Sequence, residues 1–316
     1  MSVVETTEPM PPVEVAEPQP EPEPHGPART GFPIRRVLST TLIIMSASLL
    51  GFTLYIGLIS SLHYDRAQSI AYADFRVDLA KALAPTGPLD PNDTTNRTLL
   101  APGSAMAVID IPEIGLHAVV FEGTTSDVLE SGPGHLRDTQ YPGQVGISEI
   151  MGRAAAYGGP FGRIGELSPG DEFTTTTGQG TARYRVRDLR RANDREPPPV
   201  TAGHGRLILV TADGFSFLPS GVLHVDADLV SPAQPAPPMV LTAANLAPAE
   251  QPLAGDSAAW LPLVLWGQGL FLAAGLITWA RTRWGRWQVW IVAVPLLSFL
   301  GLSVADQVAR LFLNLM

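Results

Sequence analysis

Three long apolar stretches dominate the hydropathy pattern of this chain. Residues 37–62 form a run of 26 positions without a charged side chain, and residues 258–280 and 287–305 form two more. About 20 consecutive apolar residues are enough for a helix to cross the hydrocarbon core of a bilayer. The pattern therefore predicts three transmembrane helices. A cleaved signal peptide is the alternative for the first run, but its apolar core would be shorter, and a Pro/Glu-rich arm before it would be unusual.

Two groups of arginine predict how these helices are oriented. Arg29, Arg35 and Arg36 precede the first run, and Arg281, Arg283 and Arg286 lie between the second and the third. Both groups belong on the cytoplasmic side by the positive-inside rule. We therefore expect a multi-pass protein of the plasma membrane with a cytoplasmic N-terminus and a cytoplasmic arginine loop at 281–286. The segment between the first two spans would lie outside, as would a C-terminal tail at 306–316.

The rest of the sequence divides into connecting segments and one central domain. Connecting segments rich in Pro, Glu or other polar residues bury too little apolar surface to fold alone. The expected parts are a disordered tail at 1–36, a stalk helix and linker at 63–103, a central domain at 104–231 and a Pro/Ala-rich linker at 232–257.

The stalk helix is predicted from one apolar stripe at residues 65–84. An apolar residue recurs there every four positions, at Ala71, Phe75, Leu79 and Leu83. This spacing places the four side chains on one face of a helix that packs on the central domain, and Pro85 would end it.

Short strands separated by Gly and Pro turns fill the central domain. We predict strands at 105–111, 116–120, 145–151, 172–177, 181–189, 206–211 and 221–229, with a short helix at 124–129. In the last strand Leu223, Val225 and Ala227 alternate with polar residues, as in a strand with one buried face. Closely spaced strands with few helices predict a mainly β domain folded as a small closed barrel.

Composition excludes several classes of function. The net charge is −9, whereas a nucleic-acid partner would call for an excess of Lys and Arg. The chain has no cysteine, which removes disulfides, thiolate metal sites and redox pairs. Because histidines and carboxylates do not occur at metal-ligand spacing and no Gly-rich phosphate loop follows a strand, we expect neither a metal nor a cofactor.

Four stretches of the central domain resemble the sortase family in order and spacing. They read IDIPEIG at 109–115, GPGH at 132–135, GRAAAYGGPFGRIGELSPGDE at 152–172 and LILVTA at 207–212. The resemblance covers about residues 104–231. It implies an eight-stranded barrel on the outer face of a Gram-positive membrane. Sortases cleave a sorting peptide and pass its carbonyl group to an amine.

The resemblance also implies that the catalytic positions are changed. The family's nucleophilic Cys falls on Ala212, its His on Arg153 and its Arg on Val222, or on Gly221 if the loop register differs by one. A methyl group cannot attack a carbonyl, and a guanidinium stays protonated and is a poor acid or base. Valine cannot donate a hydrogen bond to an oxyanion.

Other side chains near these positions are candidate replacements. Thr211, Ser148 and Asp213 are candidate nucleophiles, although a hydroxyl needs an adjacent base. Asp213 is also expected to form an ion pair with Arg153 that fills the old site. His135, in the GPGH turn, is expected to make a turn or a polar contact.

Three hypotheses of function remain open. The first is a pseudosortase that binds peptides by strand addition, or that scaffolds envelope proteins beside an active sortase. Its expected partners are the membrane, a peptide or sorting-signal protein, an active sortase and envelope proteins. The second is a transpeptidase or hydrolase with a nucleophile other than cysteine. The third is a structural membrane protein whose spans carry the function.

Overall fold

The computed structural model describes residues 50–52, 54–93, 95–192, 194–215, 218–255, 257–283, 286–311 and 313–316. The predicted tail at 1–36 and half of the first predicted span therefore lie outside the described residues.

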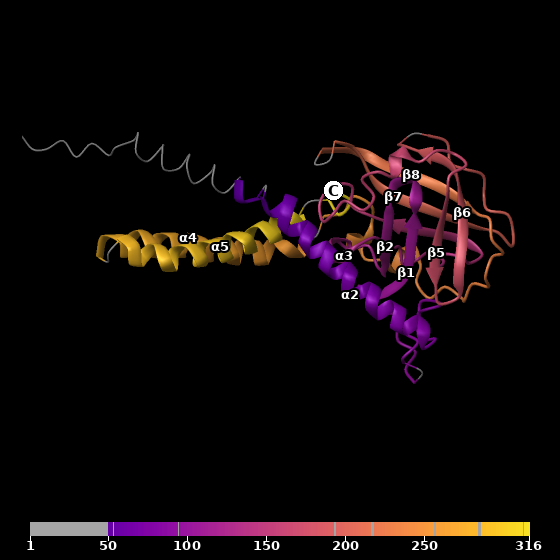
Figure 1. The fold of residues 1–316 in the computed structure, drawn as a ribbon, viewed down its shortest axis with the longest axis horizontal. Coiled ribbons are helices and arrows are strands. Elements are labelled where there is room, and N and C mark those ends of the chain that lie inside the picture. Colours follow the sequence, from indigo (N-terminus) through magenta and orange to yellow (C-terminus); the bar gives the residue numbers. More distant parts are fainter. Residues whose placement is uncertain are drawn as a thin grey trace, which may run out of the picture. The chain divides into compact units, whose positions relative to one another are not determined.

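The central domain is a closed barrel of eight strands (Figure 1). The strands neighbour one another in the order β1-β2-β3-β4-β7-β8-β6-β5. This confirms the prediction of a mainly β fold with a closed eight-stranded barrel. The strands are β1 (Ala105–Ile111), β2 (Leu116–Glu122), β3 (Gly134–His135), β4 (Gly146–Met151), β5 (Glu172–Thr177), β6 (Gly180–Arg190), β7 (Gly205–Phe215) and β8 (Leu218–Leu229).

Alternating side chains fill the barrel and set the register of its strands. Ile109, Leu207, Leu209 and Val225 are fully buried in the main core cluster. Strands β4 and β7 run parallel, whereas β7 and β8 form an antiparallel pair. Parallel strands need a long crossover, and the chain between β4 and β7 supplies it with β5 and β6.

Strand β3 has only two residues and was not predicted. It lies between β2 and β4 and closes that part of the barrel. A Cβ atom at Gly134 would lie 2.1 Å from the carbonyl oxygen of Gly123, so only glycine fits this close approach. Two residues are too few to show a periodic pattern, so this strand is recognised only by its pairing with β2 and β4.

Helix α2 (Ser60–Ala80) follows a short π-helix η1 (Tyr55–Ile59) and packs on the barrel. Phe75 is fully buried there, and Ala71 and Leu79 pack on the same cluster. The predicted stripe is confirmed for these three residues but wrong for Leu83. The helix ends at Ala80, Ala82 adopts a left-handed backbone with φ 55°, and Leu83 is exposed.

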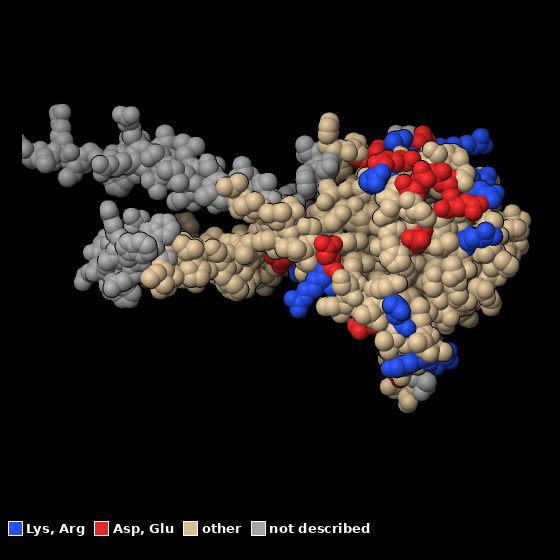
Figure 2. Space-filling model, in the orientation of Figure 1, with Lys and Arg blue, Asp and Glu red and all other residues tan. Residues whose placement is uncertain are grey.

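Two helices near the end of the chain are long and apolar enough to cross a membrane, within the described residues. They are α4 (Trp260–Arg283) and α5 (Arg286–Leu311). Figure 2 shows that the charged side chains gather over the barrel, while the described surface of α4 and α5 in this view is mostly uncharged. The remaining helices are α3 (Ser126–Ser131) and the short 3-10 turns η2 (Pro112–Ile114), η3 (Ile164–Glu166), η4 (Ala243–Asn245), η5 (Pro248–Glu250) and η6 (Ser257–Ala259).

The segment 306–316, expected as a tail, is ordered against other parts of the chain. Helix α5 continues to Leu311 because Ala305 and Ala309 pack with Tyr55. Beyond it, the last residues Asn314, Leu315 and Met316 are buried. The term "313–316 segment" is used below for Leu313 to Met316.

Candidate functional site

The structure brings together Ala212, Val222 and Arg153, the three positions that the resemblance matches to the family's Cys, Arg and His. Ala212 on β7 and Val222 on β8 are direct cross-strand partners, while Gly221 pairs with Asp213. Arg153 follows β4, and the Gly152 amide just before it donates to the Val210 carbonyl on β7 at 2.9 Å. Because side chains alternate along a strand, Val222 and not Gly221 shares a face with Ala212.

Arg153 is buried, and its guanidinium donates hydrogen bonds to two residues. Its Nη2 donates to the carbonyl oxygen of Ser126 at 2.9 Å and to the Ser126 hydroxyl at 2.8 Å. Its Nη1 donates to the carbonyl oxygen of Met316 at 3.3 Å. The guanidinium also lies 4.9 Å from the centroid of the Tyr157 ring, a cation–π distance. Arg153 is therefore a fixed hydrogen-bond donor and does not serve as an acid or base.

The expected ion pair between Arg153 and Asp213 is not formed. Asp213 instead faces Arg191, with 3.3 Å between Oδ2 and Nε. The alternation of β7 explains this, because Ala212 packs toward the site and Asp213 must point to the opposite face.

Among the described residues, neither candidate hydroxyl is hydrogen-bonded to a base. The Thr211 hydroxyl is buried and donates to the carbonyl oxygen of Gly152 at 2.8 Å. Ser148 lies opposite Leu207 and is buried, and its hydroxyl has no hydrogen-bond partner among the described residues. Hydroxyl activation requires a hydrogen-bonded base, so this geometry does not prepare either group for attack.

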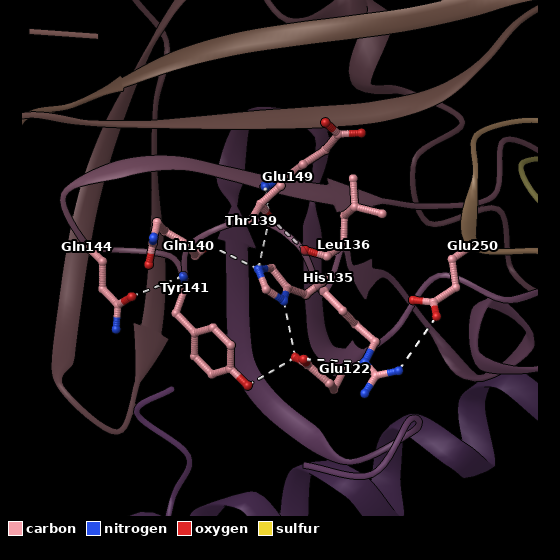
Figure 3. A network of polar contacts seen from close by, with 10 residues as sticks. Glu122, His135, Leu136, Thr139, Gln140, Tyr141, Gln144, Glu149 and Glu250 are labelled. Atoms are coloured by element: carbon pink, nitrogen blue, oxygen red, sulfur yellow. Dashed lines mark hydrogen bonds and ion pairs between the residues drawn. The ribbon is translucent and has the colours of Figure 1, made fainter. Parts of the chain in front are cut away.

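His135 belongs to a separate buried network (Figure 3). Its Nδ1 lies 3.1 Å from Glu122 Oε2, and its Nε2 lies 3.0 Å from the Gln140 carbonyl oxygen. The Tyr141 hydroxyl donates to the same Glu122 oxygen at 3.1 Å, and Arg137 lies 3.9 Å from Glu122 and 3.6 Å from Glu250. Both ring nitrogens are engaged, so His135 ties β2, β3 and the following loop together.

The 313–316 segment packs in the same place as Ala212, Val222 and Arg153. Leu315 is fully buried in a cluster with Leu129, Met151 and Val210, and Ala212 and Val222 pack on this cluster. Sequence reasoning missed this contact. Nothing in the local pattern marks it, because the partners of Leu315 are distant in the chain.

Main-chain hydrogen bonds fix the same segment. The Ala154 amide donates to the Leu315 carbonyl oxygen, and the Asn314 amide donates to the Ala254 carbonyl oxygen, both at 2.8 Å. The Asn314 side-chain amide donates to the carbonyl oxygens of Thr124 and Gln251, both at 3.0 Å. The site thus holds a peptide segment by its backbone and one leucine side chain.

A buried carboxyl lies beside this site. Glu130 on α3 lies 3.6 Å from Arg310 of α5, and its Oε1 has no hydrogen-bond partner among the described residues. Burial raises the pKa of the Glu130 carboxyl to about 7, and the positive charges of Arg310 and Arg153 offset this only in part. The described residues contain no cluster of three His, Asp or Glu side chains that could bind a metal.

Comparison with known proteins relates this architecture to sortases. Residues 109–218 match the family model of the sortase domain. Sortase D of Bacillus subtilis (strain 168) is 30% identical over 118 residues, which are 37% of this chain and 58% of that protein. The match therefore spans less than two thirds of the length of this curated relative.

Solved structures of sortases align over about half of the chain. A sortase D5 transpeptidase of Clostridium perfringens has a TM-score of 0.42 at 24% identity, covering 54% of this chain and 100% of that one. A sortase C of the same organism, solved with the C-terminal cell wall sorting motif, has a TM-score of 0.39 at 18% identity, covering 52% of this chain and 89% of that one.

Proposed function

Because this chain belongs to the sortase family through its domain at 109–218, we propose that it binds peptides without cleaving them. The proposed binding site, called the cleft below, is formed by Arg153, Ala154, Ala212 and Val222 around the 313–316 segment. One observation carries the proposal. The positions that match the family's Cys, His and Arg lie together, and they hold a methyl group, a buried guanidinium and an isopropyl group. These positions offer neither a nucleophile nor a general base, and Val222 cannot donate a hydrogen bond to an oxyanion.

The chemistry of the cleft supports a binding role. It offers a main-chain amide at Ala154, a fixed cation at Arg153 and an apolar surface that includes Ala212 and Val222. Backbone hydrogen bonds give affinity for a peptide, and a side-chain pocket gives selectivity. The ligand class is therefore a peptide segment with one leucine-sized side chain, as in a sorting signal or another envelope protein.

We further propose that the barrel is held outside the plasma membrane. The two apolar helices α4 and α5 support this, together with the apolar run at 37–62 and the arginines that flank these segments. In this arrangement the protein presents an uncut sorting signal to an active sortase or organises envelope proteins at the surface.

Mass spectrometry of the full chain tests the proposal. The protein in detergent is incubated with C-terminal peptides of envelope proteins, and free, retained and covalently attached masses are read together. We expect retained, uncut peptide. A matched pair of variants localises the binding: Ala212→Trp fills the cleft and should abolish retention, whereas Ala202→Trp in an exposed loop should not.

Two results would contradict the proposal. Cleaved peptide or a covalent adduct would reveal an enzyme with a nucleophile other than cysteine, and the adduct would locate it. The Leu315→Ser variant vacates the leucine position. If neither the wild type nor this variant retains peptide, the binding role is contradicted.

A further inference from the structure

We propose that the 313–316 segment is an internal ligand that fills the peptide cleft and must be displaced before another peptide can bind. The inference rests on the proposed peptide-binding function, since it names the occupant of that same cleft.

The contacts of this segment are those of a bound peptide. Its backbone receives a hydrogen bond from Ala154 at 2.8 Å and another from Arg153 at 3.3 Å. Leu315 is the one side chain that enters the apolar cluster, and its exposed fraction is 0%. Main-chain recognition with a single side-chain pocket is the usual way in which a cleft accepts a peptide.

The same replacements that remove the chemistry create the leucine position. Ala212 and Val222 stand where the resemblance places a cysteine and an arginine, and both pack on the cluster around Leu315. A charged arginine at position 222 would be costly beside a fully buried leucine. The altered positions are therefore matched to an apolar side chain.

Asn314 adds a second element of selectivity. Its side-chain amide donates to Thr124 on one loop and to Gln251 on another, each at 3.0 Å. An amide that bridges two carbonyl oxygens cannot be replaced by a carboxylate, which only accepts. We infer that the cleft selects an Asn-Leu pair.

Two buried polar atoms without hydrogen-bond partners make the internal ligand displaceable. Asn314 Oδ1 and Arg153 Nε are buried and have no hydrogen-bond partner among the described residues. Each unsatisfied buried polar atom lowers the stability of the bound arrangement. The covalent link to α5 compensates for this through a high effective concentration. A competing peptide that satisfies these atoms would displace the segment.

The absence of cysteine from the chain provides a direct test. A single thiol is introduced as Ala212→Cys in the full-length protein in detergent, and its rate of alkylation by a small maleimide is measured. We expect slow alkylation, and an acceleration of at least about tenfold when Leu315→Ser is added. Leu313→Ser is the matched control, because Leu313 is only half-buried and is not part of the cluster.

A synthetic peptide distinguishes a ligand from a mere cover. A peptide with the sequence of residues 309–316 should restore slow alkylation in the Ala212→Cys, Leu315→Ser protein. The same peptide with serine in place of its Leu315 should not. If Leu315→Ser lowers the melting temperature strongly, Asn314→Ala provides the second variant. We expect it to alkylate at a rate between those of the Ala212→Cys parent and the Leu315→Ser variant.

The outcomes separate this inference from the proposed function. Equal alkylation rates in Leu315→Ser, Asn314→Ala and the parent protein would overturn the internal ligand and leave peptide binding to its own test. Acceleration by both variants without protection by any added peptide would confirm closure by the segment and contradict peptide binding in trans.

Discussion

The contacts of Arg153 are those of a structural residue. A guanidinium needs several acceptors when it leaves water, and here Ser126 and Met316 supply three oxygen atoms. The ring of Tyr157 covers one face of the group. These contacts use the planar fork of arginine, which neither lysine nor histidine reproduces.

Replacing Arg153 should therefore destabilise the protein even when charge is kept. We expect Arg153→Lys to lower the free energy of unfolding by about 2–4 kcal/mol, because a buried charge loses its partners. Chemical denaturation of the full chain measures this. The control is Arg163→Lys, at an exposed ion pair with Glu166, where no measurable change is expected. Equal effects of the two substitutions would contradict the structural role.

Glu130 predicts a pH dependence of stability. Burial raises the pKa of this carboxyl to about 7, although Arg310 and Arg153 are nearby. A raised pKa means that the folded protein binds the proton more tightly than the unfolded chain does. The contribution of protonated Glu130 to the stability of the folded protein is therefore full below about pH 4.5, and it is lost as the pH rises through about 7. We expect the melting temperature of Glu130→Gln to fall less between pH 5 and pH 8 than that of the wild type.

A second glutamate provides the comparison for this prediction. Glu166 is exposed and its hydrogen bond from Arg163 lowers the pKa of its carboxyl. Because this shift has the opposite sign, Glu166→Gln cannot reduce the fall in melting temperature at high pH. A Glu130→Gln protein with the same pH profile as the wild type would show that Glu130 does not titrate in this window.

At the scale of elements, α2 depends on one aromatic side chain. Phe75 is fully buried between the helix and the barrel, where it meets Val108 and Val119 among others. We expect Phe75→Ala to lower the free energy of unfolding by about 3–5 kcal/mol, through lost burial and the cavity left behind. Val77→Ala is the control two residues later, since Val77 is 48% exposed and its loss should have little effect. Similar losses in chemical denaturation would mean that α2 does not pack as described.

The contrast between α2 and the 313–316 segment explains what the sequence can predict. Phe75 and Leu79 repeat with the helical period, so their shared face could be inferred locally. The β7–β8 hairpin likewise follows from alternation along two neighbouring strands. The other buried members of the Leu315 cluster are all more than a hundred positions away in the chain. The expected pair of Asp213 with Arg153 is not formed because adjacent residues of β7 point to opposite faces. Packing between residues that are distant in the chain leaves no periodic hydrophobic pattern in the sequence of the segments that meet.

At the scale of the whole molecule, the cleft is joined to the proposed membrane anchor. The 313–316 segment follows α5, and Arg310 of that helix lies 3.6 Å from Glu130 at the cleft. The hydroxyl of Tyr55, in η1 just before α2, donates to Asp306 at 2.7 Å and so connects this part of the chain to the same end of α5. Any displacement of the segment must therefore act on the end of this helix.

The last prediction concerns the orientation of the protein in its membrane. The proposed topology places the barrel outside and the arginine loop at 281–286 inside. Single cysteines introduced into the cysteine-free chain as Ser220→Cys, on the exposed part of β8, and Thr282→Cys report the two sides. In intact cells, a membrane-impermeant maleimide should label Ser220→Cys and should reach Thr282→Cys only after permeabilisation.

The reverse pattern would place the barrel in the cytoplasm, where it could not meet exported proteins. Labelling of both sites in intact cells would show that α4 and α5 do not span the membrane.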